Sequence, residues 1–212
     1  MINHDCRIRR RGPGLTAMRF SLVAVALGAA LGLTGCQFKT VAEPSLNKRD
    51  TEWMALTPQP EVDPGYARYE VDDPTGEKPG TVIVDIKERQ LYYVLPNKRA
   101  IRYGVVVGDE AFGWTGTARI ARKAEWPSWN PPPEMKRRWP HVHAMGPGAA
   151  NPLGARALYL FQGNRDTLYR IHGTNEPEKI GQAASSGCIR MRNIDVVDLY
   201  NRVGVNTKVV VR

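Results

Sequence analysis

From residue 80 onward, the chain consists of short runs of β-forming residues separated by turn residues. The runs are rich in valine, isoleucine, leucine and tyrosine, which favour pleated strands. They lie at 81–86, 90–95, 100–107, 157–161, 167–171 and 207–211. Only a few residues join the first three runs, which predicts a three-stranded meander. A chain with this pattern is expected to form a mostly antiparallel β domain.

One segment departs from the strand pattern and predicts a short helix. Asn193 precedes residues 194–203, whose apolar side chains fall largely on one helical face, and Gly204 follows them. Asparagine is a favoured N-cap residue, and glycine is favoured just past a helix end. The predicted fold class is therefore mainly β, with one short helix.

The stretch 108–153 lacks this regularity and is too long for an ordinary connection. It contains four tryptophans and the run Pro131-Pro132-Pro133. Two interpretations stay open. The stretch is either an ordered insertion that forms a lid or the wall of a cleft, or a loop whose tryptophans only cover the core.

The first 36 residues decide which cysteines belong to the mature protein. Four arginines are followed by an apolar run at 20–33, and the tetrapeptide Leu-Thr-Gly-Cys occupies 33–36. A basic start, a short apolar run and small residues at the end predict a secretory signal peptide over 1–35. The ending resembles the bacterial lipobox, in which the cysteine, here Cys36, becomes the lipid-bearing first residue. An ordinary cleaved signal is the alternative.

Residues 36–79 are predicted to form a proline-rich, acidic linker between the lipid and a folded domain at 80–212. Residues 37–79 hold five Lys and Arg against nine Asp and Glu, so an extended, semi-rigid tether is expected. Residues 80–212 hold 20 basic against 11 acidic residues, a net charge of +9. Outside the cytoplasm this excess favours an anionic polymer or an acidic substrate over nucleic acid, and solubility explains it equally well.

Cys188 is the thiol that remains once the signal is removed and Cys36 carries lipid, which excludes a disulfide. A cysteine attacks carbonyls as its thiolate and needs a neighbour that takes its proton. His172 is the candidate base, and Arg190 adds positive potential. Gly187 frees the backbone to aim amides at an oxyanion. The pattern indicates acyl transfer, although each residue alone also fits a structural role.

Several separate stretches, in order, resemble the L,D-transpeptidase catalytic domain, also called the YkuD domain. They are 79–85 (PGTVIVD), 122–127 (RKAEWP), 131–135 (PPPEM), 151–159 (NPLGARALY), 172–177 (HGTNEP) and 185–193 (SSGCIRMRN). The resemblance extends over about 79–212. It implies a β-sandwich-like fold with a short helix after the catalytic cysteine, and it requires no metal or organic cofactor.

The resemblance also implies a reaction on peptidoglycan stem peptides. Such enzymes cleave the bond between the diamino acid at position three and the terminal D-alanine, and then pass the acyl group to an amine. In this chain Cys188 would attack the carbonyl, and His172 would take the proton and later protonate the leaving amine. The Gly173 carbonyl would orient the imidazole through its second nitrogen.

The loop before the cysteine is expected to supply the oxyanion hole, through amides near Ser186, Gly187 and Cys188. Arg190 is expected to hold a substrate carboxylate or to order this loop. Many members of the family have Ser-His-Gly-Cys where this chain has a second serine, Ser186. Because that histidine is not the base, activity is expected to persist.

Alternatives to transpeptidation remain at this point. His141, His143 and His172 are candidates for a three-histidine zinc site, against which Pro140 and the glycines at 146–148 indicate a loop. Another alternative is an envelope lipoprotein that binds peptidoglycan without turnover. A third is an L,D-carboxypeptidase, in which water accepts the acyl group.

The expected partners and location follow from the same features. The partners are peptidoglycan stem peptides, an envelope protein if it is the acyl acceptor, and a membrane reached through the N-terminal lipid, with no nucleic acid. The expected location is the periplasmic side of the cell envelope. Gln37, in place of an aspartate after Cys36, favours the outer membrane.

Overall fold

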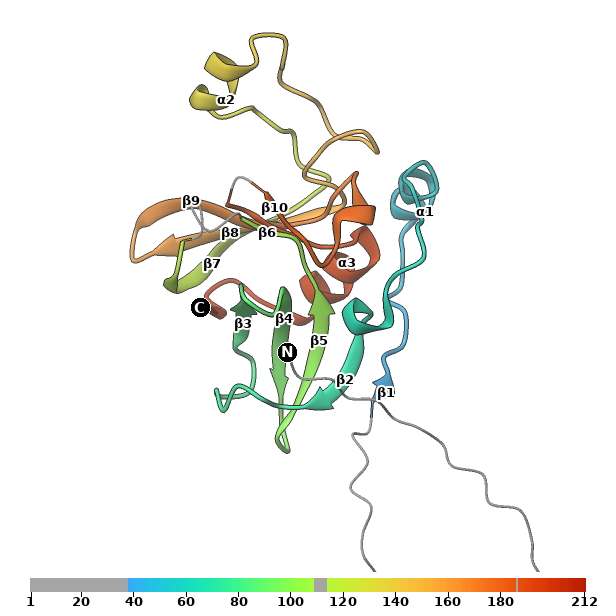
Figure 1. Cartoon of the computed structure of the whole chain (residues 1–212), viewed down its shortest axis with the longest axis vertical. Helices are drawn as coiled ribbons and strands as arrows, with labels where there is room; N and C mark the ends of the chain where they lie inside the picture. Colours follow the sequence, from blue (N-terminus) through green and yellow to red (C-terminus); the bar gives the residue numbers. More distant parts are fainter. Residues whose placement is uncertain (1–37, 109–113, 186) are drawn as a thin grey trace, which may run out of the picture. The chain divides into compact units, whose positions relative to one another are not determined.

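The computed structural model describes residues 38–212, apart from 109–113 and residue 186. These residues belong to one compact unit, which the contacts delimit as Gly35–Arg212 (Figure 1). Its strands are β1 (Lys39–Thr40), β2 (Tyr69–Asp72), β3 (Val82–Asp85), β4 (Gln90–Leu95), β5 (Arg99–Gly104), β6 (Val107–Gly108), β7 (Gly116–Glu125), β8 (Arg156–Gln162), β9 (Arg165–His172), β10 (Ala183–Ser185), β11 (Ile189–Arg190) and β12 (Lys208–Val211). Its helices are α1 (Lys48–Met54), α2 (Pro133–Arg138) and α3 (Asn193–Arg202), with 3-10 turns η1 (Pro64–Tyr66) and η3 (Pro177–Lys179). The predicted fold class, mainly β, is confirmed, and the described residues contain three short helices where one was predicted.

Ten strands form one sheet in the order β1-β2-β5-β4-β3-β12-β7-β8-β9-β11. The predicted meander is present, since β3 pairs antiparallel with β4, and β4 with β5. Strand β12 joins the two halves of the sheet by pairing parallel with β3 and antiparallel with β7. The main hydrophobic core takes residues from both halves and from α3, and a smaller cluster around Ile83 and Tyr92 covers part of β2, β3, β4 and β5. Strands β6 and β10 form a separate parallel pair.

Helix α3 lies against β8 and buries Val196, Val197 and Leu199 (Figure 1). The helix was expected over 194–203 and is found one residue earlier. The expected N-cap role of Asn193 is wrong, because Arg192 occupies the cap and Asn193 is the first helical residue. Its side chain is engaged by the backbone near the candidate site instead, as described below.

The segment predicted to be an extended linker is folded in its described part. It contains β1, α1, η1 and β2, and β2 continues the main sheet by pairing with β5. A capping box between Asn47 and Asp50 starts α1. The prolines lie outside α1, and Pro64 is the first residue of η1, a position that proline tolerates. The prolines therefore mark where the helices of this segment begin and end, and they do not exclude helices from it.

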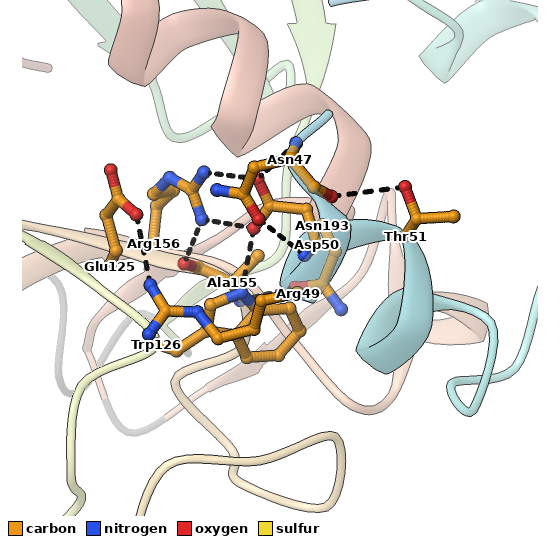
Figure 2. Close-up of polar contacts among 9 residues, drawn as sticks. All are labelled: Asn47, Arg49, Asp50, Thr51, Glu125, Trp126, Ala155, Arg156 and Asn193. Carbon is orange, nitrogen blue, oxygen red and sulfur yellow. Dashed lines mark hydrogen bonds and ion pairs between the residues drawn. The ribbon is translucent and has the colours of Figure 1, made fainter. Parts of the chain in front are cut away.

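Helix α1 is attached to the domain by a buried ion pair (Figure 2). The Asp50 carboxylate accepts hydrogen bonds from Arg156 Nη1 and Nη2 at 2.8 and 2.7 Å. It also accepts one from Trp126 Nε1 at 2.8 Å. Trp53 packs edge-on against Trp126, with ring centroids 5.0 Å apart. Since Trp126 follows β7 and Arg156 begins β8, α1 holds the ends of two central strands together.

The stretch 108–153 is more regular than predicted, because the ten-residue strand β7 occupies part of it. Positively charged side chains alternate along β7 with buried residues such as Ala118 and Ile120, which obscures the apolar pattern. Trp126 is buried in the core, as the second interpretation of this stretch proposed for its tryptophans. Trp139, just after α2, is exposed. None of the helices in the described residues combines the length and apolar character needed to cross a bilayer.

Candidate active site

Pairing of two strands brings together residues that lie eighteen positions apart in the sequence. Strand β11 runs parallel to β9, with Ile189 opposite Ile171 and Arg190 opposite His172. Both isoleucines are buried in the core. Because side chains alternate across a strand, His172 and Arg190 emerge on the other face. Cys188 directly precedes β11, so its side chain belongs to the same face as that of His172.

His172 is arranged as a neutral base. Its side chain is buried, and Nδ1 lies 2.7 Å from the carbonyl oxygen of Gly173. A carbonyl only accepts hydrogen bonds, so Nδ1 carries the proton of the neutral ring and Nε2 has the free lone pair. Burial, aided by the charge of Arg190, lowers the pKa of His172 from 6.5 to about 4. The imidazole is therefore neutral at pH 7 and able to accept a proton.

Cys188 is half-buried and protonated at rest. Its Sγ lies 4.0 Å from the Leu168 carbonyl oxygen, which accepts a weak S–H hydrogen bond. Burial raises the pKa of the Cys188 thiol, and the charges of Arg170 and Arg190 oppose this effect. The two side chains therefore rest as thiol and neutral imidazole, the protonation states that general-base activation of a thiol requires.

A serine hydroxyl closes the turn before the thiol. Ser185 Oγ donates to the Cys188 carbonyl oxygen at 2.6 Å and accepts from the Gly187 amide at 3.1 Å. Gly187 has a φ of 119°, which side-chain-bearing residues rarely adopt. In this structure the Gly187 amide, an expected oxyanion donor, is thus engaged by Ser185. Ser186 lies outside the described residues, and Ser185 was not among the residues predicted to form the site.

Arg190 forms an ion pair with Glu176 at 2.9 Å, and Lys179 binds the same carboxylate at 2.6 Å. Glu176 belongs to the segment between the candidate base and the thiol, so these contacts tie that segment to β11. The two roles expected for Arg190, holding a substrate carboxylate or ordering the loop before the cysteine, stay predictions. Its charge still lies near His172, whose protonated form it disfavours.

Asn193 holds the backbone next to His172 through its side-chain amide. It was not predicted to be a site residue. Its Oδ1 accepts from the amides of Ala155 and Thr174 at 2.9 and 3.2 Å, and its Nδ2 donates to the Thr174 carbonyl at 2.9 Å. A Cβ on Gly173 would lie 2.2 Å from Asn193 Oδ1, so only glycine fits there. The amide clamps the backbone that carries the Gly173 carbonyl, and no spacing in the sequence points to this contact.

The alternative zinc site does not form among the residues that the structure describes. Within 38–108, 114–185 and 187–212, no three His, Cys, Asp or Glu side chains gather as a metal site would require. His141 and His143 are exposed in the segment after α2. His172, in contrast, is buried at the end of β9.

Comparison with known proteins gives a family match over most of the folded part. The family model described as the L,D-transpeptidase catalytic domain, YkuD, matches residues 79–211. A "Putative L,D-transpeptidase in ATP synthase subunits region ORF 5" from Fuscovulum blasticum is 42% identical over 94 residues, 44% of this chain and 48% of that protein. The "Probable L,D-transpeptidase ErfK/SrfK" of Escherichia coli K12 is 35% identical over 138 residues, 60% of this chain and 42% of that protein. The chain thus matches about half the length of these relatives.

A solved structure agrees with the fold. The structure named "L,D-transpeptidase from Mycobacterium smegmatis" aligns with a TM-score of 0.50 at 15% identity. The alignment covers 72% of this chain and 70% of that one. At such low identity, the likeness concerns the arrangement of strands and helices alone.

Proposed function

Because the chain belongs to the L,D-transpeptidase catalytic domain family, we propose that it is a peptidoglycan L,D-transpeptidase that works through a Cys188 thioester. The substrate would be a stem tetrapeptide, cleaved between the diamino acid and the terminal D-alanine. The acyl group would pass to an amine of another stem or of an envelope protein. The observation that supports this most is the pairing of β9 with β11, which puts a carbonyl-oriented imidazole and a thiol on one face.

The proposed first half-reaction transfers one proton and forms one bond. Cys188 Sγ attacks the carbonyl carbon of the diamino acid while its proton moves to His172 Nε2. The resulting oxyanion collapses, the bond to the D-alanine nitrogen breaks, and that nitrogen takes the proton from His172. The products are a thioester on Cys188 and free D-alanine.

The second half-reaction reverses these roles. The amine acceptor attacks the thioester carbonyl and gives its proton to His172 Nε2. The C–S bond breaks, and the imidazole returns the proton to the Cys188 sulfur, which restores the thiol. The hydrogen bond from Nδ1 to the Gly173 carbonyl holds the ring in one tautomer throughout.

The test is product analysis with a purified disaccharide-tetrapeptide. We expect equimolar release of D-alanine together with a cross-linked dimer, detected by mass spectrometry. Tripeptide without dimer would identify a hydrolase, in which water is the acceptor. Bound but unchanged substrate would contradict an enzyme of this kind and leave a peptidoglycan-binding lipoprotein.

The pH dependence follows from the lowered pKa of His172. The base is active when neutral, so the rate of acylation by a carbapenem should stay level from pH 8 down to about pH 5. It should fall only as the pH approaches about 4, the pKa of the buried imidazole. An acidic limb centred near 6.5, the ordinary histidine value, would contradict a buried neutral base.

Stability must be followed in the same experiment. The folded-state pKa of His172 lies below its unfolded value, so the unfolded chain binds more protons as the pH falls. This group therefore reduces the stability of the fold between about pH 6.5 and pH 4. Circular dichroism at each pH separates a loss of folded protein from a loss of catalytic base.

The N-terminal part of the proposal concerns residues outside the described range. We propose that residues 1–35 are a lipoprotein-type signal peptide and that Cys36 carries lipid at the periplasmic face of the envelope, at the outer membrane. The support is the order of the basic start, the apolar run and Leu-Thr-Gly-Cys in the sequence. A Cys36→Ala chain that still incorporates labelled fatty acid would contradict the anchor.

A further inference from the structure

A row of side chains crosses the sheet toward the thiol. Arg122 on β7 is opposite Tyr159 on β8, and Tyr159 is opposite Arg170 on β9. The Arg122 guanidinium lies 3.5 Å from the Tyr159 ring centroid, and that of Arg170 lies 4.5 Å from it, so all three share one face. By the register of β9 and β11, Cys188 is the next side chain along this row.

The remote end of this row opens into a pocket of about 490 Å³. It is lined by Arg119 and Arg122 of β7, Tyr159 and Phe161 of β8, and Asp166 of β9. These strands are neighbours in the sheet, so the pocket lies on strands with extensive backbone hydrogen bonding. Sites built on such strands hold their side chains in fixed positions.

The arginine side chains at the pocket outnumber its acidic side chains. Arg170 binds the Asp166 carboxylate at 2.7 and 2.8 Å, so that carboxylate already has its counter-ion. Arg119 donates to two uncharged oxygens, of Asn206 and Gly163. Within the described part of the chain, neither Arg119 nor Arg122 has an acidic side chain at ion-pair distance. Two guanidinium groups therefore face the pocket without an ion-pair partner, and the Asp166 carboxylate acts on Arg122 only at longer range.

The geometry suits a carboxylate above a flat apolar surface. With its face on Tyr159, the Arg122 guanidinium leaves its edge N–H groups available, and that edge matches a carboxylate in a bidentate arrangement. Tyr159 and Phe161 offer ring surface to a peptide backbone or a methyl group. The pocket thus combines charge recognition with a surface for an extended chain.

We propose that this pocket binds a carboxylate of the peptide substrate at a distance from the bond that reacts. The Arg122 guanidinium stacks on Tyr159 of β8, two strand spacings or about 10 Å from the strand of Cys188, which is about three residues of extended chain. A stem peptide with its diamino acid at the thiol is long enough to reach it. The inference rests on the proposed function and names Arg122 and Arg119 as specificity-determining residues. Binding energy from this remote contact helps to position the scissile bond.

The experiment measures binding apart from catalysis. The full chain carrying Cys188→Ala is titrated calorimetrically with an acidic stem tetrapeptide. It is also titrated with the same peptide in which all carboxylates except the C-terminal one are amidated. Adding Arg122→Gln should weaken binding of the acidic peptide roughly tenfold. It should change binding of the amidated peptide by less than about twofold. The matched control is Lys87→Gln, which removes one positive charge from the exposed turn after β3 and should leave both affinities unchanged.

Two outcomes would overturn the proposal: unchanged affinity of Arg122→Gln for the acidic peptide, or an equal loss for both peptides. The unmodified protein is treated with a carbapenem in parallel, because its adduct reports on Cys188 chemistry alone. An adduct together with unaffected binding would refute the pocket and leave the proposed function standing. The absence of an adduct, with Arg122-dependent binding of the acidic peptide, would refute the reaction and leave the pocket as a binding site.

Discussion

Replacing Cys188 by alanine is expected to lower the rate of D-alanine release from a stem tetrapeptide by about 10⁴-fold or more. In the proposed mechanism the sulfur is the atom that forms the thioester, and no other described cysteine is available to replace it. Cys188→Ser keeps the size of the side chain but supplies a far less acidic hydroxyl, so it should be nearly as inactive.

Stability measurements make this prediction specific. Cys188 is half-buried next to a turn, so its truncation removes little packing and the melting temperature should change by only a few degrees. Substrate binding should be retained. Turnover by the folded alanine variant at a rate close to that of the unmodified protein would exclude a thioester on Cys188.

The second large effect concerns stability. Asp50→Ala should lower the free energy of unfolding by about 3–5 kcal/mol, because it leaves the Arg156 charge buried without its partner. It also removes the acceptor of the Trp126 indole N–H. Urea denaturation followed by fluorescence of the tryptophans measures this change.

A matched surface pair provides the control. Arg49 of α1 and Glu125 at the end of the neighbouring strand β7 form an ion pair at 3.2 Å, but both side chains are exposed, so Glu125→Gln should cost less than about 1 kcal/mol. Equal effects of the two substitutions would show that the buried pair does not attach α1. The hydrogen bonds from Arg156 and Trp126 keep the pKa of Asp50 below its usual value despite burial. This contribution is therefore lost as the pH falls into the acidic range.

Asp50→Ala should also affect activity, because the backbone of Arg156 is hydrogen-bonded to the residue that follows His172. The Arg156 carbonyl accepts from the Gly173 amide at 3.0 Å, and the Gly173 carbonyl orients His172. A displacement of Arg156 would therefore be transmitted to His172 through these two hydrogen bonds. The segment that was predicted from the sequence to be a tether therefore helps, through Asp50 of α1, to position the candidate site.

The strands with apolar runs were predictable because their residues reveal burial directly. The runs at 81–86 and 90–95 correspond to β3 and β4, whose buried residues are valine, leucine, isoleucine and Tyr92. Strand β7 was missed because its outward side chains are arginines and its inward ones include Lys123, which donates to the carbonyls at the end of α3. A strand with charged side chains on both faces can be recognised only when the strands that pair with it are known.

The candidate base and nucleophile were identified from residue type, and their meeting depends on a pairing that sequence does not reveal. Parallel pairing of β9 with β11 is long-range and leaves no local signature. The roles of Asn193 and Ser185 were missed for the same reason, since their partners are backbone groups brought near by folding. The N-terminal helix was missed because it is short and packs only Trp53 and Met54 on the core, while its Asp50 ion pair leaves no pattern in the sequence.

The most direct test of the central claim is the intact mass of the protein after reaction with a carbapenem. The account predicts a single covalent adduct, located on the peptide that contains Cys188 and absent from Cys188→Ala, while Lys87→Gln is labelled like the unmodified protein. No adduct on folded protein, or an adduct that persists in Cys188→Ala, would contradict a nucleophilic thiol at this position.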